Sequence, residues 1–191
     1  MSEAAVDTLR SDPVLEPLIN EHGPVRLEPA EQPFERLIVS ITNQQLSGAS
    51  AAAIRERLFD RFEITPEALA VADPAELTDT GLSRQKTQYV QHAAEAFIAH
   101  GYDVEYFEEM SDEAVIEELT EIRGIGRWTG KMFLMFCLAR EDVFPVEDLG
   151  IRRGMEALFG ADITRTEMVD RAERWRPYRS YASLYLWRTV D

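Results

Sequence analysis

The chain has 191 residues, a length that suits either one compact unit or two small lobes with a sizeable core. It has a single cysteine, Cys137, which excludes an intrachain disulfide and a four-cysteine iron–sulfur cluster. No apolar run approaches the ~20 residues of a membrane span and no signal segment is visible, so we expect a cytoplasmic protein without membrane contact.

The net charge of −15 is unusual for a protein that would meet nucleic acid, because neutralising phosphates normally drives that affinity. Only Lys86 and Lys131 are lysines, so the other 18 of the 20 basic residues are arginines. Excess acid with scarce lysine is favoured in molar salt, where the screening length falls to about 3 Å. We therefore expect a halophilic archaeon as the source; a GC-rich genome is the open alternative. Residues 105–121 hold eight of the carboxylates and no basic residue.

Helical periodicity covers almost the whole chain, and no convincing strand pattern appears. The predicted helices are 13–22, 34–45, 48–62, 66–72, 74–80, 84–99, 111–122, one that begins near 128, 149–159, 165–175 and 180–189. Several have proline in the first turn, and Ser111 is a predicted N-cap. The sequence therefore predicts an all-α fold with short loops.

Two glycines separate the helix that ends at Ile122 from the helix that begins near Trp128. Gly124 and Gly126 permit a tight turn that brings bare backbone amides close to a ligand. The amino end of the second helix adds N–H groups and a partial positive charge. This segment predicts a grip on a phosphate backbone.

An acidic residue, Asp148, follows the second glycine after 22 positions and directly precedes a predicted helix. Its ordinary role there is that of an N-cap. A lone carboxylate near a bound phosphate backbone could also do chemistry there. Both roles can reside in one side chain, and Glu147 is the alternative carboxylate.

Three ordered segments carry a resemblance to a known family. Ile122–Gly130 resembles the helix-hairpin-helix of base-excision DNA glycosylases, and Asp148 falls where that superfamily keeps its catalytic aspartate. Pro33–Ser47 and Trp175–Arg188 are similar to the alkyl-purine branch, that of 3-methyladenine DNA glycosylase II. The resemblance runs from about residue 13 to the end of the chain.

This resemblance implies two helical lobes with an active cleft between them, one of residues 33–140 with the hairpin at about 111–140, the other of residues 1–32 plus 141–191. It implies a monomer that acts on damaged double-stranded DNA in base excision repair. The expected reaction is the flipping and hydrolytic excision of alkylated purines such as 3-methyladenine and 7-methylguanine.

The resemblance also assigns roles to individual residues. The family's strand-nicking members hold a Schiff-base lysine at the position of Trp128, so a monofunctional enzyme is implied. The implied base pocket contains Trp128, Trp187, Gln44 and Met132, and Leu46 would fill the gap left in the duplex. The implied contacts with the DNA backbone are Gly124, Gly126, Arg127, Thr129 and Lys131.

Alternatives stay open for these residues. Both tryptophans are also explained as core packing, Gln44 as a solvated residue, and the cations Arg127 and Lys131 as ordinary surface charges. Met132 replaces a tyrosine of some relatives, which leaves the preferred lesion unsettled. Deaminated or oxidised bases are the alternative substrates; a non-catalytic helix-hairpin-helix DNA-binding module and an acidic protein adaptor are the alternative functions.

No cofactor is required by this interpretation. The three histidines and Cys137 form no metal motif in the sequence, so we expect no catalytic metal. The resemblance does imply a site for one Na⁺ or K⁺ at the hairpin, formed by the backbone carbonyls of Thr120, Ile122 and Ile125.

Overall fold

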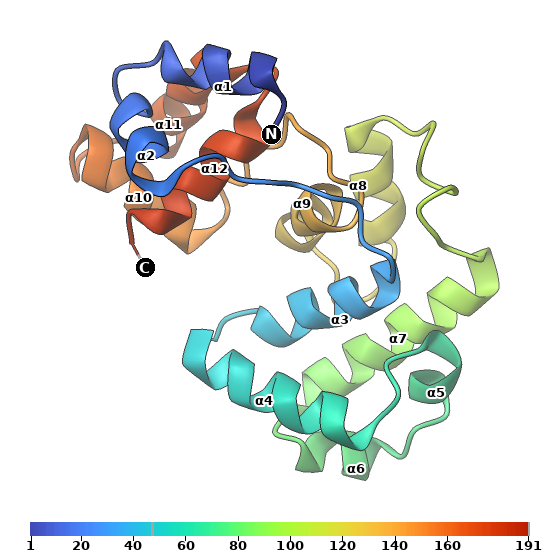
Figure 1. Ribbon diagram of the computed structural model, residues 1–191. Coiled ribbons are helices and arrows are strands. Elements are labelled where there is room, and N and C mark those ends of the chain that lie inside the picture. Colours follow the sequence, from blue (N-terminus) through green and yellow to red (C-terminus); the bar gives the residue numbers. More distant parts are fainter. Residues whose placement is uncertain (47, 191) are drawn as a thin grey trace. The chain divides into compact units, whose positions relative to one another are not determined.

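The structure is a computed structural model that describes residues 1–46 and 48–190 (Figure 1). Ser47, the last residue of the Pro33–Ser47 segment, lies outside the described residues. The described part of the chain contains twelve α-helices, one 3₁₀ helix and no strand, so the predicted all-α fold is confirmed. None of these helices is both long and apolar enough to cross a membrane.

The chain divides into two compact units. Unit 1 consists of Met1–Glu28 and Ala139–Asp191, and unit 2 of Pro29–Leu138. The boundaries implied by the family resemblance, 33–140 for one lobe and 1–32 plus 141–191 for the other, lie a few residues from these. Each unit has its own helices and is described by itself.

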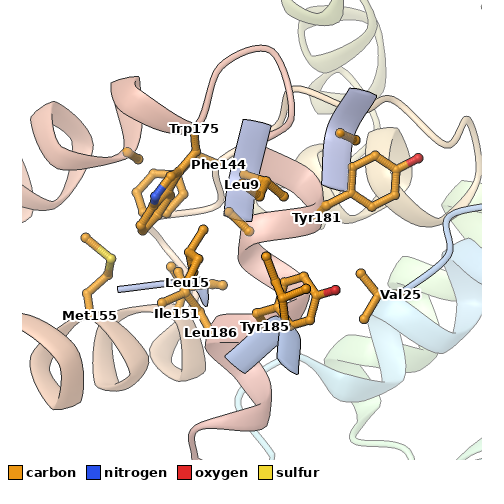
Figure 2. Close-up of a cluster of buried hydrophobic side chains, with 14 of the residues drawn as sticks. Leu9, Leu15, Val25, Phe144, Ile151, Met155, Trp175, Tyr181, Tyr185 and Leu186 are labelled. Carbon is orange, nitrogen blue, oxygen red and sulfur yellow. The ribbon is translucent and has the colours of Figure 1, made fainter. Parts of the chain in front are cut away.

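Unit 1 is formed by the N-terminal and C-terminal segments of the chain. Its elements are α1 (Glu3–Arg10), α2 (Glu16–His22), α10 (Leu149–Phe159), α11 (Arg165–Ala172), the 3₁₀ helix η1 (Glu173–Trp175) and α12 (Arg179–Arg188). The buried side chains of Leu9, Leu15, Ile151, Trp175 and Tyr185 meet in one apolar cluster (Figure 2). The indole Nε1 of Trp175 donates a hydrogen bond to Asp12 at 3.0 Å. The buried N–H of the indole therefore has a hydrogen-bond partner.

Helices α10 and α12 approach each other closely at Gly154. A Cβ at this glycine would lie 2.6 Å from the carbonyl oxygen of Leu186, so no larger residue fits without moving a backbone. Nearer the start of α10, Gly150 lies beside Trp187 of α12, so the end of α12 is close to Asp148, the N-cap of α10.

Unit 2 is built around the longest helix, α7 (Arg84–His100), which packs against α3, α5 and α6 (Figure 1). Its other elements are α3 (Pro33–Asn43), α4 (Gly48–Arg61), α5 (Pro66–Ala70), α6 (Pro74–Asp79), α8 (Asp112–Thr120) and α9 (Arg127–Phe136). Helix α9 packs against both α3 and α8. Unit 2 therefore fixes the hairpin between α8 and α9 against the end of α3.

The predicted helices occur with small differences at their ends. The predicted helix 165–175 ends as an α-helix at Ala172 and continues as the 3₁₀ helix η1. Helix α1 was not predicted, although Ser2 caps it by accepting a hydrogen bond from the N–H of Ala5 at 3.2 Å.

Candidate functional site

The hairpin begins where α8 ends. The hydroxyl of Ser111 accepts a hydrogen bond from the N–H of Ala114 at 3.2 Å, which confirms the predicted N-cap of α8. Ile122 and Ile125 are buried, and the N–H of Ile125 donates to the carbonyl of Ile122 at 3.0 Å. These two side chains anchor the turn, while Arg123 between them is exposed.

The two glycines of the hairpin differ in what they do. Gly124 has a φ of +100°, and a Cβ there would lie 2.1 Å from the ring of Tyr89, so both its backbone and its neighbour require glycine. Gly126 is the N-cap of α9 with a φ of −110°, a conformation that any residue adopts, and a Cβ there meets nothing within 4 Å. Gly124 therefore makes the turn, and Gly126 leaves open space at the start of α9.

The first intrahelical hydrogen bond of α9 runs from the N–H of Gly130 to the carbonyl of Gly126 at 2.9 Å. N–H groups of a first turn have no partner within their own helix and form an anion-binding end. Thr129 lies in this turn, but its side chain is 1% exposed and its hydroxyl accepts a hydrogen bond from Gln44 at 3.0 Å. The side chain of Thr129 is therefore engaged within unit 2 and is not available to a ligand.

Arg127 forms an ion pair with Glu113 of α8. Its Nη1 lies 2.8 Å from one carboxylate oxygen and its Nη2 lies 3.4 Å from the other, and both side chains are exposed. This pairing lowers the pKa of the Glu113 carboxyl, with a smaller contribution from Lys131. In the structure, Glu113 of the acidic segment 105–121 thus pairs with Arg127, which is expected to bind DNA.

Gln44, an expected residue of the pocket rim, connects the end of α3 to the hairpin. It follows α3, and its side-chain amide donates to the carbonyl of Gly124 and to the hydroxyl of Thr129, both at 3.0 Å. The next residue, Gln45, has a φ of +57°, and Leu46 is 40% exposed. Gln44 therefore joins this turn to the hairpin, while Leu46 faces solvent.

The other expected pocket residues in unit 2 both lie on α9. Trp128 is in its first turn and is partly exposed. Met132 is buried, with 5% of its surface exposed.

Asp148 caps α10 and is held by two elements of unit 1. Its Oδ1 accepts a hydrogen bond from the N–H of Ile151 at 3.0 Å and another from Nε1 of Trp187 at 2.8 Å. Asp148 is therefore an N-cap, as one of its two predicted roles requires, and it is also clamped by a tryptophan 39 residues away. Trp187 orients a carboxylate in addition to any role in a pocket.

Two further residues support this geometry and were not identified from the sequence. A Cβ on Gly150 would lie 2.7 Å from Cδ1 of Trp187, so the glycine makes room for the indole. Arg152 donates from Nη1 to the carbonyls of Val146 and Glu147, at 3.3 and 2.5 Å, and so holds the loop that carries Asp148. In the sequence, these two residues could have been found as the glycine and the arginine that follow Asp148 by two and four positions.

The sequence profile described as "HhH-GPD superfamily base excision DNA repair protein" matches residues 38–179, which include both the hairpin and Asp148. The chain belongs to the HhH-GPD family. The resemblance drawn from the three segments is thereby confirmed.

Individual members of the HhH-GPD family are similar over most of the chain. "DNA-3-methyladenine glycosylase 1" of Schizosaccharomyces pombe is 36% identical, over 90% of this chain and 78% of that protein. "DNA-3-methyladenine glycosylase 2" of Escherichia coli is 32% identical, over 86% of this chain and 60% of that protein. A solved structure of the S. pombe enzyme Mag1 in complex with abasic DNA matches with a TM-score of 0.90 and 33% identity, covering 98% of this chain and 96% of that one.

Proposed function

We propose that the protein is a monofunctional DNA glycosylase that excises alkylated purines from duplex DNA by hydrolysing the N-glycosidic bond. The observation that carries the proposal is the carboxylate of Asp148, fixed by the Ile151 N–H and the Trp187 indole. Relatives that are named 3-methyladenine glycosylases, at 36% and 32% identity, support the choice of lesion.

The proposed chemistry needs little more than a well-placed negative charge. Breaking the bond between the sugar C1′ and the base gives an oxocarbenium-like sugar, and a carboxylate beside that carbon stabilises the developing charge. The same carboxylate orients or deprotonates the attacking water. Two N–H donors on Oδ1 hold the side chain in one orientation, so little reorganisation is needed when the charge develops.

The choice of an alkylated purine follows from charge. Alkylation at N3 or N7 makes the base cationic, which weakens the glycosidic bond and attracts the base to an electron-rich aromatic face. Trp128, partly exposed on α9, supplies such a face in the proposal. Because this hairpin position holds tryptophan and not lysine, no Schiff base forms there and the product is an abasic site.

The hairpin supplies the proposed grip on the DNA backbone. The open space at Gly126 and the first turn of α9 support the approach of a phosphate to the amino end of the helix. Arg127 and Lys131 are the proposed side-chain contacts, and Leu46 is the proposed filler of the gap in the duplex. Arg127 must exchange the carboxylate of Glu113 for a phosphate when DNA binds.

The backbone carbonyls of the hairpin are suitable ligands for a monovalent cation. Na⁺ and K⁺ prefer oxygen donors, and the proposed ligands are the carbonyls of Thr120, Ile122 and Ile125. The Ile122 carbonyl accepts one hydrogen bond, from Ile125, and keeps a second lone pair for an ion. When bound at these residues, the ion would supply a positive charge that favours binding of a DNA phosphate.

We also propose that the acidic surface is an adaptation to a salt-rich cytoplasm, as in a halophilic archaeon, and that the protein acts there as a monomer. Six of the eight carboxylates in 105–121 are exposed, where they bind hydrated cations and interact weakly with DNA at molar salt. Equilibrium unfolding across a KCl series tests this, because a protein equally stable at low salt refutes the adaptation.

The decisive experiment measures free methylpurines released from methylated duplex DNA in molar KCl. Wild type is expected to release them, with strand breaks only after hot alkali, and Asp148→Asn is expected to release none. Asparagine caps helices as well as aspartate does, so this variant keeps its fold. Glu147→Gln, which removes the neighbouring carboxylate, is the matched control and keeps its activity. Full activity in Asp148→Asn refutes the proposed mechanism, and binding without base release in wild type refutes the proposed function.

A further inference from the structure

The turn that follows α3, residues 44–46, has an unusual backbone. Gln45 has a positive φ of 57°, which a glutamine rarely adopts because its Cβ crowds the following carbonyl. The turn also comes where the last carbonyls of α3 lack partners within their helix. Such a turn keeps one conformation only if its neighbours hold it.

Lys86 of α7 provides this support. Its Nζ donates hydrogen bonds to the carbonyls of Thr42 and Gln44, at 2.7 and 2.6 Å. An ammonium suits this position because its three donors lie on one compact atom, whereas the donors of a guanidinium are spread over a rigid plane. Lys86 is one of two lysines among 20 basic residues, and its partial burial lowers the pKa of its amine.

The same turn reaches the hairpin through Gln44, whose amide donates to the Gly124 carbonyl and the Thr129 hydroxyl. Helix α7 also contacts the hairpin itself, because the Tyr89 ring lies against Gly124. Lys86 and Tyr89 are three residues apart and so lie on one face of α7. One helix face therefore supports both the turn and the hairpin.

We infer that Lys86 is a positioning residue, which fixes the 44–46 turn against the hairpin so that Leu46 and the amino end of α9 engage DNA as one rigid part. The inference rests on the proposed function, in which Leu46 enters the duplex and the hairpin binds the backbone. Without the ammonium, the turn is free to leave its strained conformation and Leu46 loses its fixed position.

A double-mutant cycle between Lys86→Met and Leu46→Ala tests this. Methionine keeps the length of the side chain and removes the donors, and Arg84→Met, which removes an exposed charge from the same helix, is the matched control. The first readout is the affinity for a duplex that contains a tetrahydrofuran abasic analogue. The second is the single-turnover rate of methylpurine release, and thermal unfolding reports on the fold.

Leu46→Ala is expected to weaken duplex binding about tenfold in the wild-type background and less than about threefold beside Lys86→Met. Arg84→Met should leave the Leu46 effect at its full size, and Lys86→Arg should restore part of it because a donor remains. Equal effects of Leu46→Ala in both backgrounds overturn the inference, since Lys86 would then not act through the turn.

The two proposals fail in different ways. A wild type that binds the abasic duplex but releases no base refutes the proposed function, and the cycle on binding affinity still decides the role of Lys86. A wild type that releases base while the cycle is additive refutes only the role of Lys86. If Lys86→Met gives no cooperative thermal transition, the cycle is measured with Lys86→Arg.

Discussion

Replacing Gly150 with alanine places a methyl group against the Trp187 indole. The added Cβ would lie 2.7 Å from Cδ1 and 3.0 Å from Nε1 of the ring, whereas favourable contacts lie at about 3.5–4.0 Å. The ring must therefore retreat by about 1 Å, and a 2.8 Å hydrogen bond to Asp148 that lengthens by that amount is lost.

The loss can be given a magnitude. A hydrogen bond to a charged group is worth about 1.5–3 kcal/mol, so the base-release rate should fall about 10- to 100-fold if the bond acts in the transition state. Alanine is also a better helix former than glycine, by up to about 1 kcal/mol, which offsets only part of the loss of the hydrogen bond. We therefore expect a slower enzyme whose melting temperature is slightly lowered.

Single-turnover base release from methylated duplex DNA, with a thermal melt of the same preparation, provides the assay. Trp187→Phe removes the indole donor directly and should slow release to a similar extent. In that background, Gly150→Ala should add little. A Gly150→Ala rate within about twofold of wild type would refute the reasoning, because the indole bond would then not position the carboxylate.

Three further predictions address packing and charge. Gly154→Ala drives a methyl group to 2.6 Å from a backbone carbonyl of α12, so a denaturant titration should show a loss of about 1–3 kcal/mol. Glu113→Gln releases the hairpin guanidinium, so duplex affinity should rise about two- to fivefold and fall more steeply with salt; Glu117→Gln, an exposed control on the same helix, should change neither. The hydrogen bond from Arg176 lowers the pKa of the Glu173 carboxyl. The hydrogen bond therefore stabilises the folded protein fully above the ordinary pKa of 4.5, and this stabilisation is lost as the pH falls through the lowered pKa. Glu173→Gln should therefore be less stable than wild type at neutral pH, and the difference should vanish in acid melts; a difference that persists in acid contradicts the assignment.

Local signals in the sequence predicted much of the fold. Proline at first turns, the Ser111 cap and apolar spacing placed most helices within a few residues of their ends, because these signals act within one or two turns. The family resemblance also placed the hairpin and Asp148 inside the region that the HhH-GPD profile matches.

The contacts that shape the candidate site could not be predicted, because they join distant parts of the chain. The Trp187 donor lies 39 residues from Asp148, and the Gly124 carbonyl lies 80 residues from Gln44. Neither periodicity nor a motif reports a hydrogen bond between helices. The same holds for the contact between Tyr89 and Gly124, which requires a glycine in addition to the positive φ.

The ion pair between Arg127 and Glu113 bears on how long the protein stays on undamaged DNA. A glycosylase meets intact duplex far more often than a lesion, and non-specific affinity sets the length of each fruitless encounter. A carboxylate carried by the protein competes with every phosphate for the same guanidinium, which shortens the residence time on intact DNA. Under the proposed function, this internal competitor speeds the search for a rare damaged base.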